Sequence, residues 1–257
     1  MLPIGKASSQ QFSDTTHQQF GQWLNGKGKP ILVAEQRLLQ ACLPSLVGER
    51  ALEVSVGRPQ QMLNAAKHPF KWQLSQLPYG NIRANPSHWP VGRRAVDLVL
   101  LHHSLDFADH PHRVINGAVR SLSASGVLIV IGFQPLSLWG VRRWLSSRKA
   151  VPWCARHVSM KRVSEWLSVL GCEVEAIHSA CFGWPRALEQ GVWQQLGQRL
   201  WPSHGAIYML VAKRRTAMIR PLPQTTRADM VSPVVGVSMR KPAVITEDVK
   251  RDKQQHE

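Results

Sequence analysis

The stretch that most constrains the fold of this chain is residues 96–133, VDLVLLHHSLDFADHPHRVINGAVRSLSASGVLIVIGF. Residues 97–101 are a short apolar run of the kind found in strands that are covered on both faces. Apolar residues then recur at helical spacing, at Val114, Ile115, Ala118, Val119 and Leu122. Residues 127–133 are a second β-branched run. This order predicts a strand, a helix and a parallel strand, in a right-handed βαβ unit with its ligand side at the carboxyl ends of the strands.

Polar residues stand at the ends of this unit. Asp106 or Asp109 is expected to cap the helix, because a carboxylate there accepts free first-turn amides at the positive end of the helix dipole. Ser125-Gly126 is expected to end the helix. The ligand side is expected to hold residues 102–106 after the first strand and residues 132–134 at the end of the second.

The rest of the chain alternates between strand and helix signals. Strands are predicted at residues 50–56, 70–77, 81–85, 173–177 and 206–212. Helices are predicted in the second half of 22–46, from Pro59 onward, from an N-cap at Ser159 to a left-handed Gly171, and at 187–200. Residues 1–20 are polar and are expected to be loose. Together these signals predict an α/β fold with a mainly parallel sheet, helices on both faces and an antiparallel last strand.

The charge balance favours anionic partners. The chain has 32 Lys and Arg against 16 Asp and Glu, a formal net charge of +16. Nucleic acid, an acidic lipid surface or an acidic protein would suit this field, and a basic enzyme without a macromolecular ligand is the alternative. The four cysteines are scattered, and neither a signal-peptide core nor a transmembrane run is evident. A reducing, cytoplasmic location is therefore expected.

Three segments resemble the class I S-adenosylmethionine-dependent methyltransferases, and the type-11 methyltransferase domain in particular. Residues 97–133 resemble the fourth strand, the helix and the fifth strand of that family, with SLSASGVLIVIGF in the place of its "RvLkpGG" segment. SMKRVSEWLSVLGCEVEAI resembles the following helix and sixth strand, and RALEVSVGRPQQML occupies the place of the first strand and glycine loop. The resemblance spans residues 48–213 and implies the Rossmann-like fold of that family and S-adenosylmethionine as cofactor.

The cofactor motifs depart from the family pattern. Glu53 matches the acidic position of the first loop, whereas its three glycine positions hold Ser55, Gly57 and Pro59. The family places a carboxylate after the second strand to bind the ribose hydroxyls, and this chain has none between Glu53 and Asp97. Asn85 stands where a third acidic residue recognises the adenine amine, and its carbonyl keeps an acceptor for that amine.

The resemblance also divides the chain. Residues 1–47 are expected to form an N-terminal helical cap, 48–213 the methyltransferase-like domain and 214–257 a disordered basic tail. Within the domain, the resemblance implies a lid insertion at residues 134–158, because this fold often inserts a substrate lid there. The segment is basic and aromatic, with tryptophans among arginines. This insertion could lie on an anionic membrane or grip nucleic acid, or it could pack as a simple cap.

Two adjacent histidines, His102 and His103, follow the first strand of the central unit. An imidazole there could act as a general base, and the alternative is that the pair only finishes the strand. HHSLDFADHPH, with four histidines and two aspartates, also suggests a metal site. Neighbouring side chains diverge along a strand, so no metal is predicted.

The resemblance implies methyl transfer from S-adenosylmethionine to an unidentified small or macromolecular acceptor. Cofactor contacts are expected from Glu53, Ser55, Gly57, Asn85, Asp97 and His102, and His102 and His103 are the candidate catalytic residues. The alternative is a non-catalytic protein that keeps the fold and binds RNA or another polyanion through its basic surface.

Overall fold

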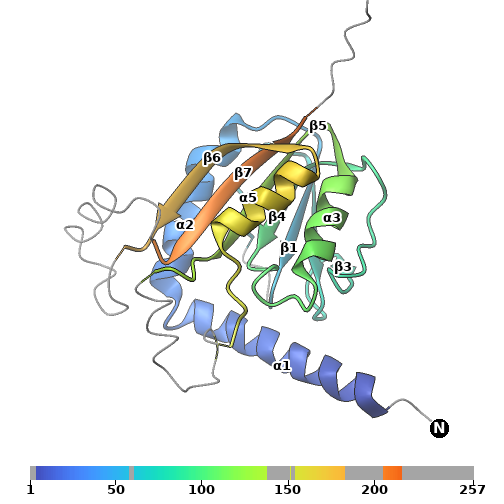
Figure 1. The fold of residues 1–257 in the computed structure, drawn as a ribbon, viewed down its shortest axis with the longest axis vertical. Helices are drawn as coiled ribbons and strands as arrows, with labels where there is room; N and C mark the ends of the chain where they lie inside the picture. Colours follow the sequence, from blue (N-terminus) through green and yellow to red (C-terminus); the bar gives the residue numbers. More distant parts are fainter. Residues whose placement is uncertain (1–3, 58–60, 138–150, 152–153, 183–204, 216–257) are drawn as a thin grey trace, which may run out of the picture. The chain divides into compact units, whose positions relative to one another are not determined.

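A computed structural model describes residues 4–57, 61–137, 151, 154–182 and 205–215, all within one compact unit, residues 1–217. Its centre is a seven-stranded sheet in the order β3-β2-β1-β4-β5-β7-β6 (Figure 1). The strands are β1 Arg50–Ser55, β2 Phe70–Ser75, β3 Ile82–Arg83, β4 Val96–His102, β5 Leu122–Phe133, β6 Cys172–Ala180 and β7 Ile207–Arg214. The helices are α1 Ile4–Asn25, α2 Lys29–Cys42, α3 Pro111–Ser121 and α5 Met160–Val169, with a 3-10 turn at Leu43–Ser45.

The sheet is parallel except at its last strand. β1 pairs in parallel with β2 and β4, and β4 pairs in parallel with β5. β7 runs antiparallel to both of its neighbours, β5 and β6. The predicted fold class, a mainly parallel α/β sheet with an antiparallel last strand, is therefore confirmed.

The helices cover both faces of the sheet, because alternate strand residues point to opposite sides. On one face, α1 and α2 pack Phe20, Leu24, Ile31 and Leu39 against strand residues such as Leu98 and Ile129. On the other face, α3 and α5 pack against a cluster that includes Val99, Leu101, Leu128 and Val130. Among the described helices, none is long and apolar enough to cross a membrane.

The central βαβ unit is confirmed, but its boundaries differ from those predicted. The helix α3 ends at Ser121, and β5 begins at the next residue, so Ser125-Gly126 lies inside the strand. The N-cap of α3 is His110, with no side-chain capping hydrogen bond, so neither Asp106 nor Asp109 caps it. Asp106 is instead fully buried and bonds the backbone of β5, as described below.

The prediction that residues 1–20 are loose was wrong. Residues 4–25 form the helix α1 even though much of the sequence is polar. In its last turns Phe20 and Leu24 are buried in the core, and His17 is nearly so. Packing of these few side chains supplies the stability that helix propensity does not.

Among the described residues, the other local elements lie where the sequence predicts them, except after Pro59. The helix expected after Pro59 is not formed at 61–66, where the amides of Asn64 and Ala66 close only four-residue turns. β2, β3, α2, β6 and β7 lie where strands and a helix were predicted. Ser159 caps α5 by accepting the amide of Arg162, and Gly171 ends it with φ +75°. The predicted helix 187–200, most of the lid and the tail lie outside the described residues.

Candidate functional site

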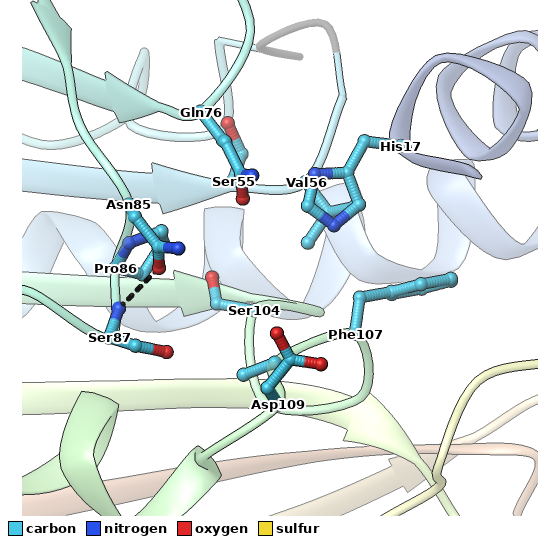
Figure 2. A pocket seen from close by; sticks show the side chains of 11 residues that line it. His17, Ser55, Val56, Gln76, Asn85, Pro86, Ser87, Ser104, Phe107 and Asp109 are labelled. Carbon is cyan, nitrogen blue, oxygen red and sulfur yellow. Dashed lines mark hydrogen bonds between the residues drawn. The ribbon is translucent and has the colours of Figure 1, made fainter. Parts of the chain in front are cut away.

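A pocket lies at the carboxyl ends of β1, β2 and β4, where ligands of parallel α/β sheets bind (Figure 2). It holds about 380 Å³ of empty space, part of it open to solvent. The lining residues lie at or after the ends of these strands and of β3, or belong to α1: His17, Ser55, Val56, Gln76, Asn85, Pro86, Ser87, Ser104, Phe107, Ala108 and Asp109.

Polar side chains hold the walls of this pocket in place. The hydroxyl of Ser104, after β4, donates to the carbonyl of Val54 in β1. The carbonyl of Asn85 accepts the Ser87 amide at 2.8 Å and leaves its NH2 group toward the pocket side (Figure 2). The Oγ of Ser55 is buried and has no hydrogen-bond partner among the described residues. An orphaned hydroxyl in a pocket wall is a group that a ligand can satisfy.

The helix α1 closes one side of the pocket. Gly57, after β1, has φ +79°, and a Cβ built there would lie 2.6 Å from the carbonyl oxygen of His17 and 3.2 Å from the amide nitrogen of Gly21. The carbonyl of Gly57 also accepts the Ser75 hydroxyl at 3.2 Å. The glycine at this position is therefore required by a left-handed turn and by the close approach of α1.

His17 presents an imidazole to this pocket. Burial lowers the pKa of His17, and the nearby carboxylates of Asp14 and Asp109 oppose that effect. The net direction is downward, which keeps the ring in its neutral, proton-accepting form at neutral pH. The ring also meets Phe107 edge to face, with centroids 6.1 Å apart.

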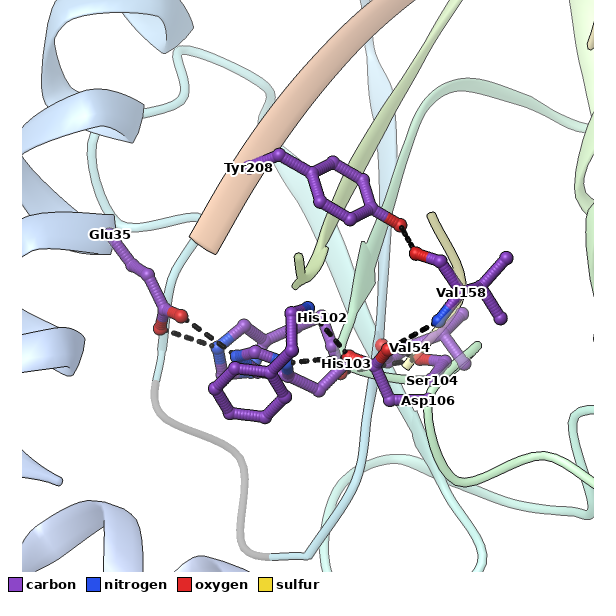
Figure 3. A network of polar contacts seen from close by, with 9 residues as sticks. Glu35, Val54, His102, His103, Ser104, Asp106, Val158 and Tyr208 are labelled. Carbon is purple, nitrogen blue, oxygen red and sulfur yellow. Dashed lines mark hydrogen bonds and ion pairs between the residues drawn. The ribbon is translucent and has the colours of Figure 1, made fainter. Parts of the chain in front are cut away.

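The two histidines expected at the ligand side are buried in the core instead (Figure 3). Glu35, from the face of α2 that covers the sheet, reaches both rings: its oxygens lie 3.0 Å from Nε2 of His102 and 2.8 Å from Nε2 of His103. All three side chains are at most 1% exposed. His103 has φ +52°, so the chain turns after β4 and both imidazoles converge on one carboxylate.

Asp106 completes this network and joins it to two further segments. Its Oδ2 lies 3.0 Å from Nδ1 of His103 and accepts the amide of Phe133 at 3.0 Å. Its Oδ1 accepts the amide of Val158, whose carbonyl accepts the hydroxyl of Tyr208 at 3.1 Å. The network therefore ties α2, β4, β5 and β7 together beneath the carboxyl edge of the sheet.

The charges in this network stabilise each other against the cost of burial. Burial alone would lower the pKa of His103, but the Glu35 charge and the hydrogen bonds to Asp106 and Glu35 raise it to about 9. Burial alone would raise the pKa of Glu35, but the His103 charge and the hydrogen bonds from both imidazoles lower it to about 2. At neutral pH the two groups form a buried ion pair.

This pair predicts how stability depends on pH in chelator-treated protein. The contribution of His103 is complete below the ordinary pKa of 6.5 and is lost as the pH rises through about 9. The contribution of Glu35 is present above 4.5 and is lost as the pH falls through about 2. Urea unfolding should therefore give a lower free energy of unfolding at pH 9 than at pH 6.5. In Glu35→Gln the free energy of unfolding should fall less between these two pH values. A free energy of unfolding that stays constant or increases from pH 6.5 to pH 9 would contradict the ion pair.

The same three residues also form a set that could hold a divalent cation. One ligand atom from each of Glu35, His102 and His103 lies within 4.8 Å of the others. Two imidazoles and a carboxylate are a common donor set for zinc and iron, and Asp106 would orient His103 as outer carboxylates do in metal sites. The prediction of no metal is not supported by this geometry, because the strand ends at His102 and the side chains converge.

The other predicted site residues are divided between the pocket and the interior. Ser55 and Asn85 line the pocket, and Gly57 adjoins it. Glu53 is fully buried within β1, where its carboxylate accepts a hydrogen bond from the side-chain NH2 group of Gln73 at 3.4 Å. Asp97 lies at the amino end of β4 and accepts the amides of residues 49 and 50, so the structure does not bring it to this edge.

Sequence reasoning missed three residues that the structure makes important, His17, Glu35 and Gln76, and it considered Asp109 only as a helix cap and within a metal motif. Gln76 directly follows β2, where the family places its ribose-binding carboxylate, and an amide at that position does not match the family pattern. Glu35 gave a signal that could have been used, because it is an acid among Ile31, Leu32 and Leu39 on the buried stripe of α2. His17 gave no signal in the sequence, since the residues around it are polar.

The strand order, the antiparallel β7 and the pocket at the carboxyl ends of β1, β2 and β4 define the class I S-adenosylmethionine-dependent methyltransferase fold. Solved structures with this fold include methyltransferases from Archaeoglobus fulgidus (TM-score 0.54, 14% identical, 76% of this chain and 99% of that chain) and Thermotoga maritima (0.52, 16%, 76% and 94%). The chain is also 32% identical over 228 residues to the uncharacterized protein YafS of Escherichia coli K12, covering 84% of this chain and 90% of that protein. It therefore belongs to the family of YafS. No family model matches the chain.

Proposed function

We propose that this chain is a methyltransferase that binds S-adenosylmethionine in the pocket of Figure 2 and transfers its methyl group to an acceptor. The observation that carries the proposal is the pocket itself. It lies at the ligand-binding edge of a class I methyltransferase sheet, and one wall holds a buried hydroxyl, Ser55, that lacks a partner among the described residues.

The residues around the pocket fit this cofactor. Gln76, after β2, offers a carbonyl acceptor to ribose hydroxyls, in place of the usual carboxylate. Asn85 offers a side-chain amide to the adenine, and Ser55 a hydroxyl. Asp109 brings a negative charge and Phe107 an aromatic ring, and both favour a cationic ligand such as a sulfonium. These residues would hold the cofactor, in place of the predicted Asp97 and His102.

The bound cofactor supplies an activated methyl group on a positively charged sulfur. The task of the chain is then to exclude water, to orient the acceptor and, where the acceptor carries a proton, to remove it. His17 is our candidate for that last role, because its imidazole faces the pocket and its pKa is lowered. His102 and His103 are committed to Glu35 in the core, so we do not propose them as bases.

Calorimetry with S-adenosylmethionine and S-adenosylhomocysteine tests the proposal. Asp109→Asn should lower the affinity for S-adenosylmethionine about fivefold, because roughly 1 kcal/mol of attraction between the exposed carboxylate and the sulfonium is lost. S-adenosylhomocysteine has an uncharged sulfur and should be affected less. Glu165→Gln, on the exposed side of α5, removes the same charge elsewhere and should change neither affinity.

Absence of binding by either compound at millimolar concentration would overturn the proposal. RNA binding with a steep dependence on salt, together with that absence, would instead support the non-catalytic alternative.

A further inference from the structure

A second cleft, with about 1270 Å³ of empty space that is partly open to solvent, lies beside the cofactor pocket. It is lined by the start of α3, by Pro135 after β5, by the chain that leads into α5 and by α5 itself. The residues that the argument uses are Asp109, His110, His112, Arg156, Arg162 and Trp166. Asp109 lines both cavities. A molecule in this cleft would therefore lie next to a cofactor bound in the pocket.

The charge of this cleft is positive. The guanidinium groups of Arg156 and Arg162 are both exposed on its walls, and Arg156 is held in place by donating to the carbonyl of Asp109 at 3.2 Å. His110 and His112 add two imidazoles, with ring centroids 5.8 Å apart. Among the described residues that line it, Asp109 is the one that is acidic, and Figure 2 shows its carboxylate turned toward the cofactor pocket.

The backbone adds to this positive field. His110 and Pro111 begin α3, and Ser159 begins α5, so the positive dipole ends of two helices face the same cleft. Ser159 caps α5, whereas no side chain among the described residues caps α3. At the start of α3, Pro111 has no N–H group and Arg113 donates to the carbonyl of His110, so the amide of His112 is the one left to donate in this described turn. Fork-shaped guanidinium groups and free helix amides are both suited to the planar oxygens of a carboxylate and to the oxygens of a phosphate.

We propose that this cleft binds the methyl acceptor and that the acceptor is a small molecule with a carboxylate or phosphate group. The inference rests on the proposed function for the acceptor role, while the anion preference rests on the cleft alone. Arg156 and Arg162 hold the anionic group, and the indole of Trp166 provides an apolar wall for the rest of the molecule. Anchoring the anion here places the remainder of the acceptor toward Asp109 and the pocket.

Titration with pyrophosphate and with citrate, followed by nuclear magnetic resonance of the backbone amides, tests the anion preference and separates the two chemistries. We expect one or both probes to shift the amide resonances of His110, His112 and Arg113 and of residues 156–162. Arg162→Gln should lower the affinity for each anion that binds by about fivefold to tenfold, because one charge-assisted contact is lost. Lys161→Gln removes a neighbouring charge from the same helix outside the cleft and should change the affinity less than twofold.

Calorimetry with S-adenosylmethionine on Arg162→Gln separates this inference from the proposed function. Cofactor affinity should be unchanged. Cofactor binding without any binding of the two anions would overturn the anion preference and leave the proposed function standing. Equal losses of anion affinity in Arg162→Gln and Lys161→Gln would also overturn the anion preference of the cleft, because they would indicate binding to diffuse surface charge. Anion binding without cofactor binding would overturn the acceptor role.

Discussion

Replacing Glu35 by glutamine is expected to lower the free energy of unfolding by about 3–5 kcal/mol, since one partner of a buried ion pair is removed. Glu35 is fully buried and accepts from Nε2 of both His102 and His103. A glutamine of the same size can accept from only one ring, and its NH2 group would face the other N–H group. The buried charge of His103 would then be balanced by Asp106 alone.

Urea unfolding in the presence of a chelator measures this loss. The chelator ensures that the change reports on the hydrogen bonds and charges of the side chains. Glu165→Gln, an exposed residue of α5, is the matched control and should change stability by less than about 0.5 kcal/mol. A loss below about 1 kcal/mol for Glu35→Gln would show that the network is not a buried charge pair.

The buried network shows where reasoning from the sequence fails. The strand before His102 and the helix after it were predictable, because continuous apolar residues and a helical period are local signals. The position of His103 was not, because it depends on a left-handed turn at a non-glycine residue. Its partner Glu35 is 68 residues away in the sequence. A contact between distant segments leaves no periodic signal.

The pocket was predictable in part, for a related reason. Ser55 follows β1, and parallel strands bring their carboxyl ends to one edge, so finding the strands is sufficient to place it. Asn85 follows β3 in the same way. His17 belongs to a polar helix that is ordered by packing on the sheet, and neither its helicity nor its position can be deduced from its neighbours. The pocket wall that α1 forms could therefore not be predicted from the sequence.

That wall underlies the second large effect: Gly57→Ala is expected to cost about 2–4 kcal/mol. Roughly 1 kcal/mol comes from forcing a side chain into the left-handed region at φ +79°, and roughly 1–3 kcal/mol from the contact of the new methyl group with the backbone of α1. The closest atom, the His17 carbonyl oxygen at 2.6 Å, cannot move unless the helix shifts. Hydrogen exchange should therefore also become faster in the last turns of α1.

Two further glycines separate these costs. Gly171 has a similar φ of +75° but nothing within 4 Å of its added Cβ, so Gly171→Ala should show only the backbone cost, about 1 kcal/mol. Gly92 has open space and no positive φ, so Gly92→Ala should be close to neutral. If Gly57→Ala cost no more than Gly171→Ala, α1 would not press on the loop after β1. His17 would then have no fixed place in the pocket, and we would withdraw its assignment as the base. The proposed cofactor contacts of Ser55, Gln76 and Asn85 would not be affected.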